Sequence, residues 1–241
     1  MKVSLVIPAY NEEKRLPATL ARVGEYLATR EPEEWEVLVV DDGSTDGTSE
    51  AGRRAAAALR SRCEIVTLPA NRGKGAAIRE GVARSRGERV LLSDADLSTP
   101  IEEWERLAAA GTPVAIGSRA LDEAMVRRRQ AWYRRILGKL FNRVVRALTI
   151  QGISDTQCGF KLFDGNVARD LFSRARIDRF AYDVEILALA RARGIAISEI
   201  PVLWYNSPES KVSVVRDLFP TLRDLVRIRL RVRREARSTN R

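Results

Sequence analysis

The chain has 241 residues, of which 45% are hydrophobic and 31% charged, a balance that favours one sizeable folded α/β domain with appendages over a disordered chain. It contains no histidine, which excludes Ser-His-Asp and Cys-His nucleophile systems, HExxH metal sites and imidazole bases. The net charge of +10 is uneven, since residues 124–146 contribute +8, residues 211–241 contribute +7 and the remainder is −5, so we expect one basic side that meets an anionic surface or ligand.

The first half of the chain alternates short apolar runs with helical patterns. The runs end in polar turns, and most are followed by apolar residues at the 3.6-residue period of a helix. This alternation predicts an α/β fold with a mostly parallel sheet flanked by helices, in which ligands bind at the carboxyl ends of the strands. The expected strands cover residues 3–8, 36–40, 63–68, 89–92 and 114–117.

The second half opens with a basic amphipathic helix. Over residues 131–148 the apolar positions keep a helical period while arginines and Lys139 fill the opposite side. A loop over 152–165, a helix over 182–193 and a strand over 196–203 are expected to follow. A new helix is expected in the tail, with Pro220 in its first turn.

Cysteine usage and hydropathy indicate the compartment. Cys63 and Cys158 are far apart and lack CxxC spacing, so two reduced thiols are expected rather than a disulfide framework or a zinc site. No run reaches about 18 uninterrupted apolar residues, and residues 1–10 do not resemble a signal peptide. We therefore expect a cytoplasmic protein.

Two carboxylates follow the fourth expected strand, in Asp94-Ala95-Asp96. Such a pair at a strand end can bind one hard cation, Mg²⁺ or Mn²⁺, which in turn can hold a diphosphate. Taken alone the pair also fits simple helix capping. Its place at the ligand edge of the sheet favours the metal.

Two further turns carry polar groups. Residues 41–48 (Asp-Asp-Gly-Ser-Thr-Asp-Gly-Thr) include capping residues, and they also place two aspartates where one could accept the ring N–H of a uracil or guanine. Residues 71–75 (Asn-Arg-Gly-Lys-Gly) form a cationic, Gly-rich turn at a helix start, which suits a phosphate but also fits a plain surface turn.

These motifs, in order and spacing, resemble family 2 glycosyltransferases of the GT-A fold, which transfer sugars from nucleotide diphosphates. The resemblance spans about residues 3–230 and includes 6–12, 39–48, 71–75, 94–96 and 116–119. Residues 154–163 (Ser-Asp-Thr-Gln-Cys-Gly-Phe-Lys-Leu-Phe) and Ser210-Lys211 look like the polyprenyl (dolichyl) phosphate glucosyltransferase and mannosyltransferase branch. Ser98 and Tyr205 stand where mannosyl enzymes often have Gln and Arg, so the glucosyl side is favoured.

The resemblance implies roles for particular residues. Asp94 and Asp96 match the metal and diphosphate site, and Arg119, Arg134 and Lys211 match catalytic cations, with Arg134 meeting the acceptor phosphate. The positions expected to bind the nucleotide sugar are Pro8, Tyr10, Glu12, Val40, Asp42, Lys74, Asp94, Ala95 and Asp96.

The sequence thus predicts an inverting enzyme that uses UDP-glucose, Mg²⁺ or Mn²⁺ and a polyprenyl phosphate, held peripherally at the inner face of a membrane. Its GT-A catalytic domain is expected over residues 1–210, including interfacial helix 131–148, and a basic helical tail over 211–241. GDP-mannose is an alternative donor, and a soluble sugar or glycerate derivative is an alternative acceptor. A nucleic-acid-binding protein is disfavoured because no helix-turn-helix, zinc-finger or RNP pattern is present. The oligomeric state is left open.

Overall fold

A computed structural model describes residues 2–122, 125–128, 149–150, 152–205 and 221–232. The predicted helix 131–148, with Arg134, lies outside these residues, as does Lys211. The described elements, in chain order, are β1 (Val3–Ala9), α1 (Leu16–Leu27), η1 (Pro32–Glu34), β2 (Trp35–Asp41), α2 (Thr48–Ala56), β3 (Arg62–Thr67), α3 (Lys74–Arg84), β4 (Arg89–Leu92), η2 (Ile101–Glu103), α4 (Trp104–Ala109), β5 (Val114–Ser118), β6 (Val126–Arg128), β7 (Lys161–Asp164), α6 (Gly165–Arg174), α7 (Tyr182–Ala192), β8 (Ile197–Pro201) and β9 (Trp204–Tyr205). Residues 221–232 form a further helix.

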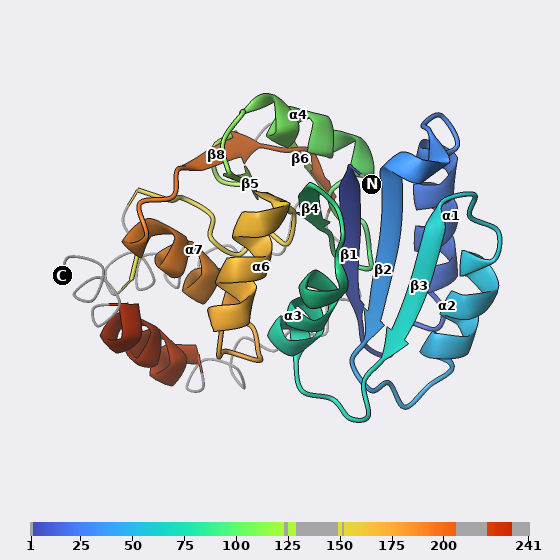
Figure 1. Cartoon of the computed structure of the whole chain (residues 1–241), viewed down its shortest axis with the longest axis horizontal. Helices are drawn as coiled ribbons and strands as arrows, with labels where there is room; N and C mark the ends of the chain where they lie inside the picture. Colours follow the sequence, from blue (N-terminus) through green and yellow to red (C-terminus); the bar gives the residue numbers. More distant parts are fainter. Residues whose placement is uncertain (1, 123–124, 129–148, 151, 206–220, 233–241) are drawn as a thin grey trace.

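Seven strands form one sheet in the order β3-β2-β1-β4-β7-β5-β8 (Figure 1). All neighbouring pairs are parallel except those of β7, which runs antiparallel to both β4 and β5. The predicted α/β fold with a mostly parallel sheet is confirmed, and the five strands expected in the first half are present within one residue at each end.

The expected loop over 152–165 is wrong at its end, because residues 161–164 form β7, an internal strand of the sheet. Lys161 opens this strand with its side chain only 1% exposed. A buried lysine breaks the apolar run by which an internal strand is recognised, so the local pattern did not reveal it.

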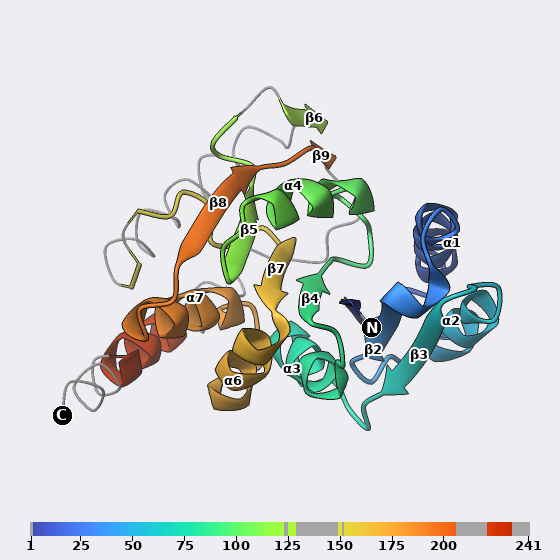
Figure 2. The same ribbon diagram turned by 45° about the horizontal axis from the view of Figure 1, so that its top comes forward.

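Alternate side chains of the sheet enter two separate cores. Val6 and Leu38 face α3, α6, α7 and the helix over 221–232, whereas Leu5 and Val37 face α1 and α4. Figure 2 shows α3, α6 and α7 along one side of the sheet, with α1 and α4 on the other. The fold is therefore a three-layer sandwich, as the two-residue side-chain period of a buried sheet requires.

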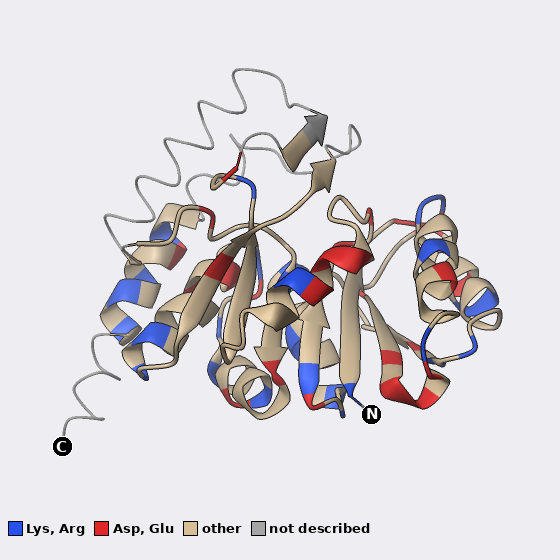
Figure 3. Cartoon of the chain, turned by 90° about the horizontal axis from the view of Figure 1, so that it is seen from above, with Lys and Arg blue, Asp and Glu red and all other residues tan. Residues whose placement is uncertain are grey.

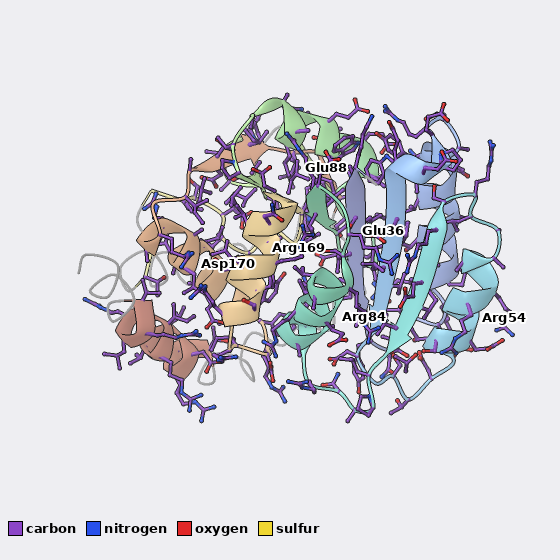
Figure 4. The ribbon with its side chains drawn as sticks, viewed as in Figure 1. Glu36, Arg54, Arg84, Glu88, Arg169 and Asp170 are labelled. Carbon is purple, nitrogen blue, oxygen red and sulfur yellow. The ribbon has the colours of Figure 1, made fainter. Side chains whose placement is uncertain are left out.

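Glu36, labelled in Figure 4, lies on β2 and links it to β1 and to the turn before β4. Its buried carboxylate accepts hydrogen bonds from Ser4 Oγ at 2.5 Å and from Arg86 N at 2.6 Å, and Ser4 Oγ accepts one from Gly87 N at 2.8 Å. These bonds fix the turn between α3 and β4. They therefore help to determine the position of β4 and of the residues that follow it, including Asp94.

The described part of the basic tail packs onto the main body. Leu225 and Ile228 are buried in the core that contains α6 and α7. Arg231 Nη1 donates to Glu185 Oε1 at 2.8 Å, and its Nη2 donates to Arg174 O. The boundary at residue 210 stays a prediction. Within the described ranges, every helix is too short or too polar to span a bilayer.

Candidate active site

The carboxyl ends of the parallel strands lie at one edge of the sheet, and the start of the antiparallel strand β7 lies at the same edge. This reversal brings residues 152–160, which precede β7, next to the turns that follow β4 and β5. Five of the sequence-predicted segments therefore meet at one edge, where α/β sheets bind their ligands.

Asp42, directly after β2, holds the turn over residues 71–73. Its carboxylate accepts hydrogen bonds from Asn71 Nδ2 at 3.0 Å, Arg72 N at 2.9 Å and Gly73 N at 2.7 Å. Burial raises the pKa of Asp42, and the backbone N–H groups of Arg72 and Gly73 oppose that rise. Asp42 thus holds two segments predicted to bind the nucleotide sugar, residues 41–48 and 71–75, against each other.

The Gly-rich turn makes close contacts with residues 177–179. A Cβ on Gly73 would lie 2.5 Å from Asp178 O, and one on Gly75 would lie 2.5 Å from Ile177 O. Ala76 N donates to Asp178 O at 3.1 Å. The backbone N–H of Ala76, one of the helix N-terminal donors predicted to bind a phosphate, is therefore hydrogen-bonded to a protein carbonyl. The contact of Lys74 with a nucleotide sugar stays a prediction.

Lys74 instead forms an ion pair with Asp94. Its Nζ lies 2.5 Å from Asp94 Oδ1 and sits over the Tyr182 ring, 5.9 Å from the centroid. Burial would raise the pKa of Asp94, but the Lys74 ammonium, with Lys161 and Arg119 farther away, lowers it below its ordinary value. Asp94 is therefore ionised, and its side chain is 37% exposed at the edge of the sheet.

Asp96 is the second carboxylate of the pair. Its Oδ1 accepts a hydrogen bond from Ser98 N at 3.0 Å. Among the described residues no three His, Cys, Asp or Glu side chains converge on a metal position. Two carboxylates without a third fit a cation that takes its other ligands from phosphate oxygens and water, as Mg²⁺ commonly does.

Arg119, directly after β5, is held by a bidentate ion pair. Its Nε and Nη2 lie 2.6 and 2.8 Å from the two oxygens of buried Asp155, and its guanidinium lies 5.5 Å from the Trp204 ring centroid. Glu199 on β8 accepts hydrogen bonds from Ser154 N and Asp155 N, which fixes the backbone of this segment. The Arg119 side chain is 30% exposed, and its bidentate ion pair fixes the guanidinium at this edge.

The remaining predicted residues lie around this edge. Glu12 pairs with Arg15 at 2.6 Å, and Tyr10 is 37% exposed. The side chains of Val40 and Ala95 are buried in the cores, and Pro8 lies within β1. The roles of all these residues stay predictions.

Three polar residues near the site were not singled out from the sequence as functional: Asp183, Glu199 and Tyr182. Each is brought to the edge from an element far along the chain, and no local motif marks it. Asp155 and Lys161 stand within the segment 154–163 used for the resemblance, but no role was assigned to them.

Solved structures with this architecture define the class of the fold. Glucosyl-3-phosphoglycerate synthase from Mycobacterium tuberculosis with UDP has a TM-score of 0.66 at 17% identity, covering 96% of this chain and 79% of that one. Mannosyl-3-phosphoglycerate synthase from Rubrobacter xylanophilus has a TM-score of 0.67 at 20% identity, covering 98% and 75%. The fold is that of GT-A glycosyltransferases.

The family follows from the sequence comparisons. The profile of Glycosyl transferase family 2 matches residues 4–172, and the chain belongs to this family. It is 38% identical to human dolichyl-phosphate beta-glucosyltransferase, over 95% of this chain and 75% of that protein. The Saccharomyces cerevisiae protein of the same name is 34% identical, over 95% and 74%. The protein is a glycosyltransferase.

Proposed function

We propose that this protein transfers glucose from UDP-glucose to the phosphate of a polyprenyl (dolichyl-type) phosphate, with inversion, to give a β-linked glucosyl phospholipid. The observation that carries the proposal is the match along 95% of the chain to proteins named dolichyl-phosphate beta-glucosyltransferase. The ionised carboxylates and fixed cations at one sheet edge provide the groups that such a transfer needs.

A divalent cation, Mg²⁺ or Mn²⁺, would be held by Asp96 and Asp94, and glucosyl-3-phosphoglycerate synthase from Mycobacterium tuberculosis, which shares the fold, binds Mn²⁺ and UDP in a crystal structure. When bound, the cation offsets the negative charge that develops on the departing UDP. Arg119 is held by Asp155 and faces the same edge, so it adds a preorganised positive charge without rearrangement. A phosphate acceptor is already anionic at pH 7, so no strong base is required.

The acceptor side rests on Arg134 and Lys211, which the family resemblance assigns to the acceptor and diphosphate. We place the enzyme peripherally at the cytoplasmic face of a membrane, with helix 131–148 and the basic tail as attachments. In the cartoon of Figure 3, Lys and Arg positions are coloured blue along the helix over 221–232. On this helix Arg223 and Arg227 alternate with exposed Val226 and Leu230, a pattern that suits an anionic lipid surface.

A substrate panel tests the proposal. UDP- and GDP-linked glucose and mannose are each offered with a short polyprenyl phosphate or with 3-phosphoglycerate, with and without Mn²⁺. Metal-dependent transfer from UDP-glucose to the polyprenyl phosphate is expected to exceed the other combinations. Faster transfer to 3-phosphoglycerate would establish the soluble-acceptor alternative. Faster transfer from GDP-mannose would overturn the proposal that UDP-glucose is the donor.

A second experiment separates the acceptor phosphate from the membrane. Deleting residues 233–241 is expected to weaken sedimentation with anionic liposomes while leaving transfer to a detergent-solubilised acceptor intact. This deletion keeps Arg231, which pairs with Glu185. Arg134→Ala should show the reverse behaviour, losing transfer but keeping liposome binding. Normal transfer by Arg134→Ala would remove that residue from the acceptor site.

A further inference from the structure

An ion pair is buried beneath the candidate site, between β7 and α7. Lys161 Nζ lies 2.5 Å from Asp183 Oδ1, and the two side chains are 1% and 6% exposed. The same Nζ donates to the carbonyl oxygen of Cys158. Lys161 therefore links the first turn of α7 to the main chain just before β7.

That main chain lies directly against Asp94. A Cβ added to Gly159 would lie 2.2 Å from Asp94 Oδ2, so the carboxylate packs on the bare Cα. On the following residue, Phe160 O accepts a hydrogen bond from Gly117 N at 2.9 Å. Residues 158–160 are thus held from below by Lys161 and from the side by β5.

Asp94 is also held by Lys74, through the 2.5 Å ion pair. Lys74 in turn lies over the ring of Tyr182, the residue before Asp183. The first turn of α7 therefore contacts both lysines that help to hold the surroundings of Asp94, with Tyr182 under Lys74 and Asp183 bound to Lys161.

Stability alone is a weak explanation for such a pair. Replacing a buried ion pair by apolar residues of similar size is often neutral or stabilising, because the desolvation of two charges offsets their attraction. A buried pair with defined hydrogen bonds does, however, impose one geometry on the groups that it joins.

We propose that Lys161 and Asp183 are positioning residues for the sugar-nucleotide site, which hold the Cys158–Gly159 main chain against Asp94 and thereby orient its carboxylate. The inference rests on the proposed function only in taking Asp94 to face the donor. The pair would therefore act on the reaction through Asp94.

The test is the double variant Lys161→Met/Asp183→Leu, which leaves no unpaired buried charge. Melting temperature, UDP affinity in the presence of Mn²⁺ by calorimetry, and kcat and KM for UDP-glucose are measured. The control is Phe172→Leu, which alters the core at a ring that packs on Phe163, 5.8 Å away between centroids. The double variant should melt near the control, while its kcat and UDP affinity fall by about tenfold or more. Wild-type kcat and UDP affinity in the double variant would overturn the proposal.

Asp183→Asn gives a second measurement, should the double variant fail to fold. The amide oxygen can still accept the Lys161 hydrogen bond, so UDP affinity is expected to stay within about threefold of the wild-type value. A loss of more than tenfold in this folded variant would show that the charge of Asp183, and not the hydrogen-bonded geometry, acts on the site, and would overturn the positioning role. If the wild-type enzyme transfers no glucose to polyprenyl phosphate, the proposed function fails, yet the ratio of UDP affinities still decides the positioning role.

Discussion

Gly159→Ala perturbs the Asp94 carboxylate without altering any charge. The added Cβ would lie 2.2 Å from Asp94 Oδ2 and 2.5 Å from its Cγ, closer than side chains tolerate. Gly159 does not have a positive φ, so its backbone accepts alanine. The strain must therefore be relieved by movement of Asp94, whose side chain is 37% exposed.

The size of the effect follows from that displacement. An ordinary contact requires the carboxylate to retreat by about 1 Å, and a misplacement of that size at a reacting centre costs roughly 10²-fold in rate. This corresponds to about 2.7 kcal/mol of transition-state stabilisation. The free energy of unfolding should change by less than about 1 kcal/mol, because the loss of glycine flexibility in the unfolded chain offsets part of the strain.

The assay compares kcat/KM for glucosyl transfer at saturating Mn²⁺ with the melting temperature of the same preparation. Gly24→Ala is the matched control, because its Cβ would meet only Leu59 at 3.7 Å and the helical position favours alanine. The control should retain full activity. Wild-type kcat/KM in Gly159→Ala would refute the argument that the Asp94–Gly159 contact sets the donor geometry.

Three further predictions concern carboxylates at the same edge. Asp96→Asn should lower transfer by about 10²-fold or more while circular dichroism is unchanged, and a tenth of wild-type activity at saturating Mn²⁺ would contradict its role as a metal ligand. Asp42→Ala releases the backbone N–H of Gly73 and two other donors, so stability should fall by about 2 kcal/mol and UDP should bind more weakly; unchanged calorimetric affinity would contradict this. Burial would raise the pKa of Asp155, but the Arg119 guanidinium lowers it below its ordinary value. A carboxylate whose pKa is lower in the folded than in the unfolded state contributes stability that is lost as the pH falls below its pKa in the unfolded chain, about 3.9. Urea unfolding between about pH 2.5 and 5 should therefore show a smaller acid-induced loss for Asp155→Asn than for the wild type, and equal losses would contradict the assignment.

Much of the site edge could be predicted because its signals are local. Apolar runs marked β1, β2 and β4, and parallel strands bring their carboxyl ends to one edge whatever their order. The segments around Asp42 and Asp94 were therefore expected to lie near each other. The resemblance to the family depended on the same segments.

The partners of these residues could not be predicted, because they depend on the order of the strands. Asp94 meets Gly159 only because β7 is inserted antiparallel between β4 and β5, and the charge of Lys161 concealed that strand. The start of α3 was predicted to bind a phosphate. There Ala76 N donates instead to Asp178 O, which is about 100 residues farther along the sequence.

The sequence by itself thus determined which chemical groups stand at the ligand edge of a parallel sheet, since alternation and turn composition act over a few neighbouring residues. Only the tertiary structure decided how those groups are paired: Lys74 with Asp94, Arg119 with Asp155, Lys161 with Asp183. Ion-pair partners are chosen by proximity in space and by burial, and both arise only when distant strands and helices pack together.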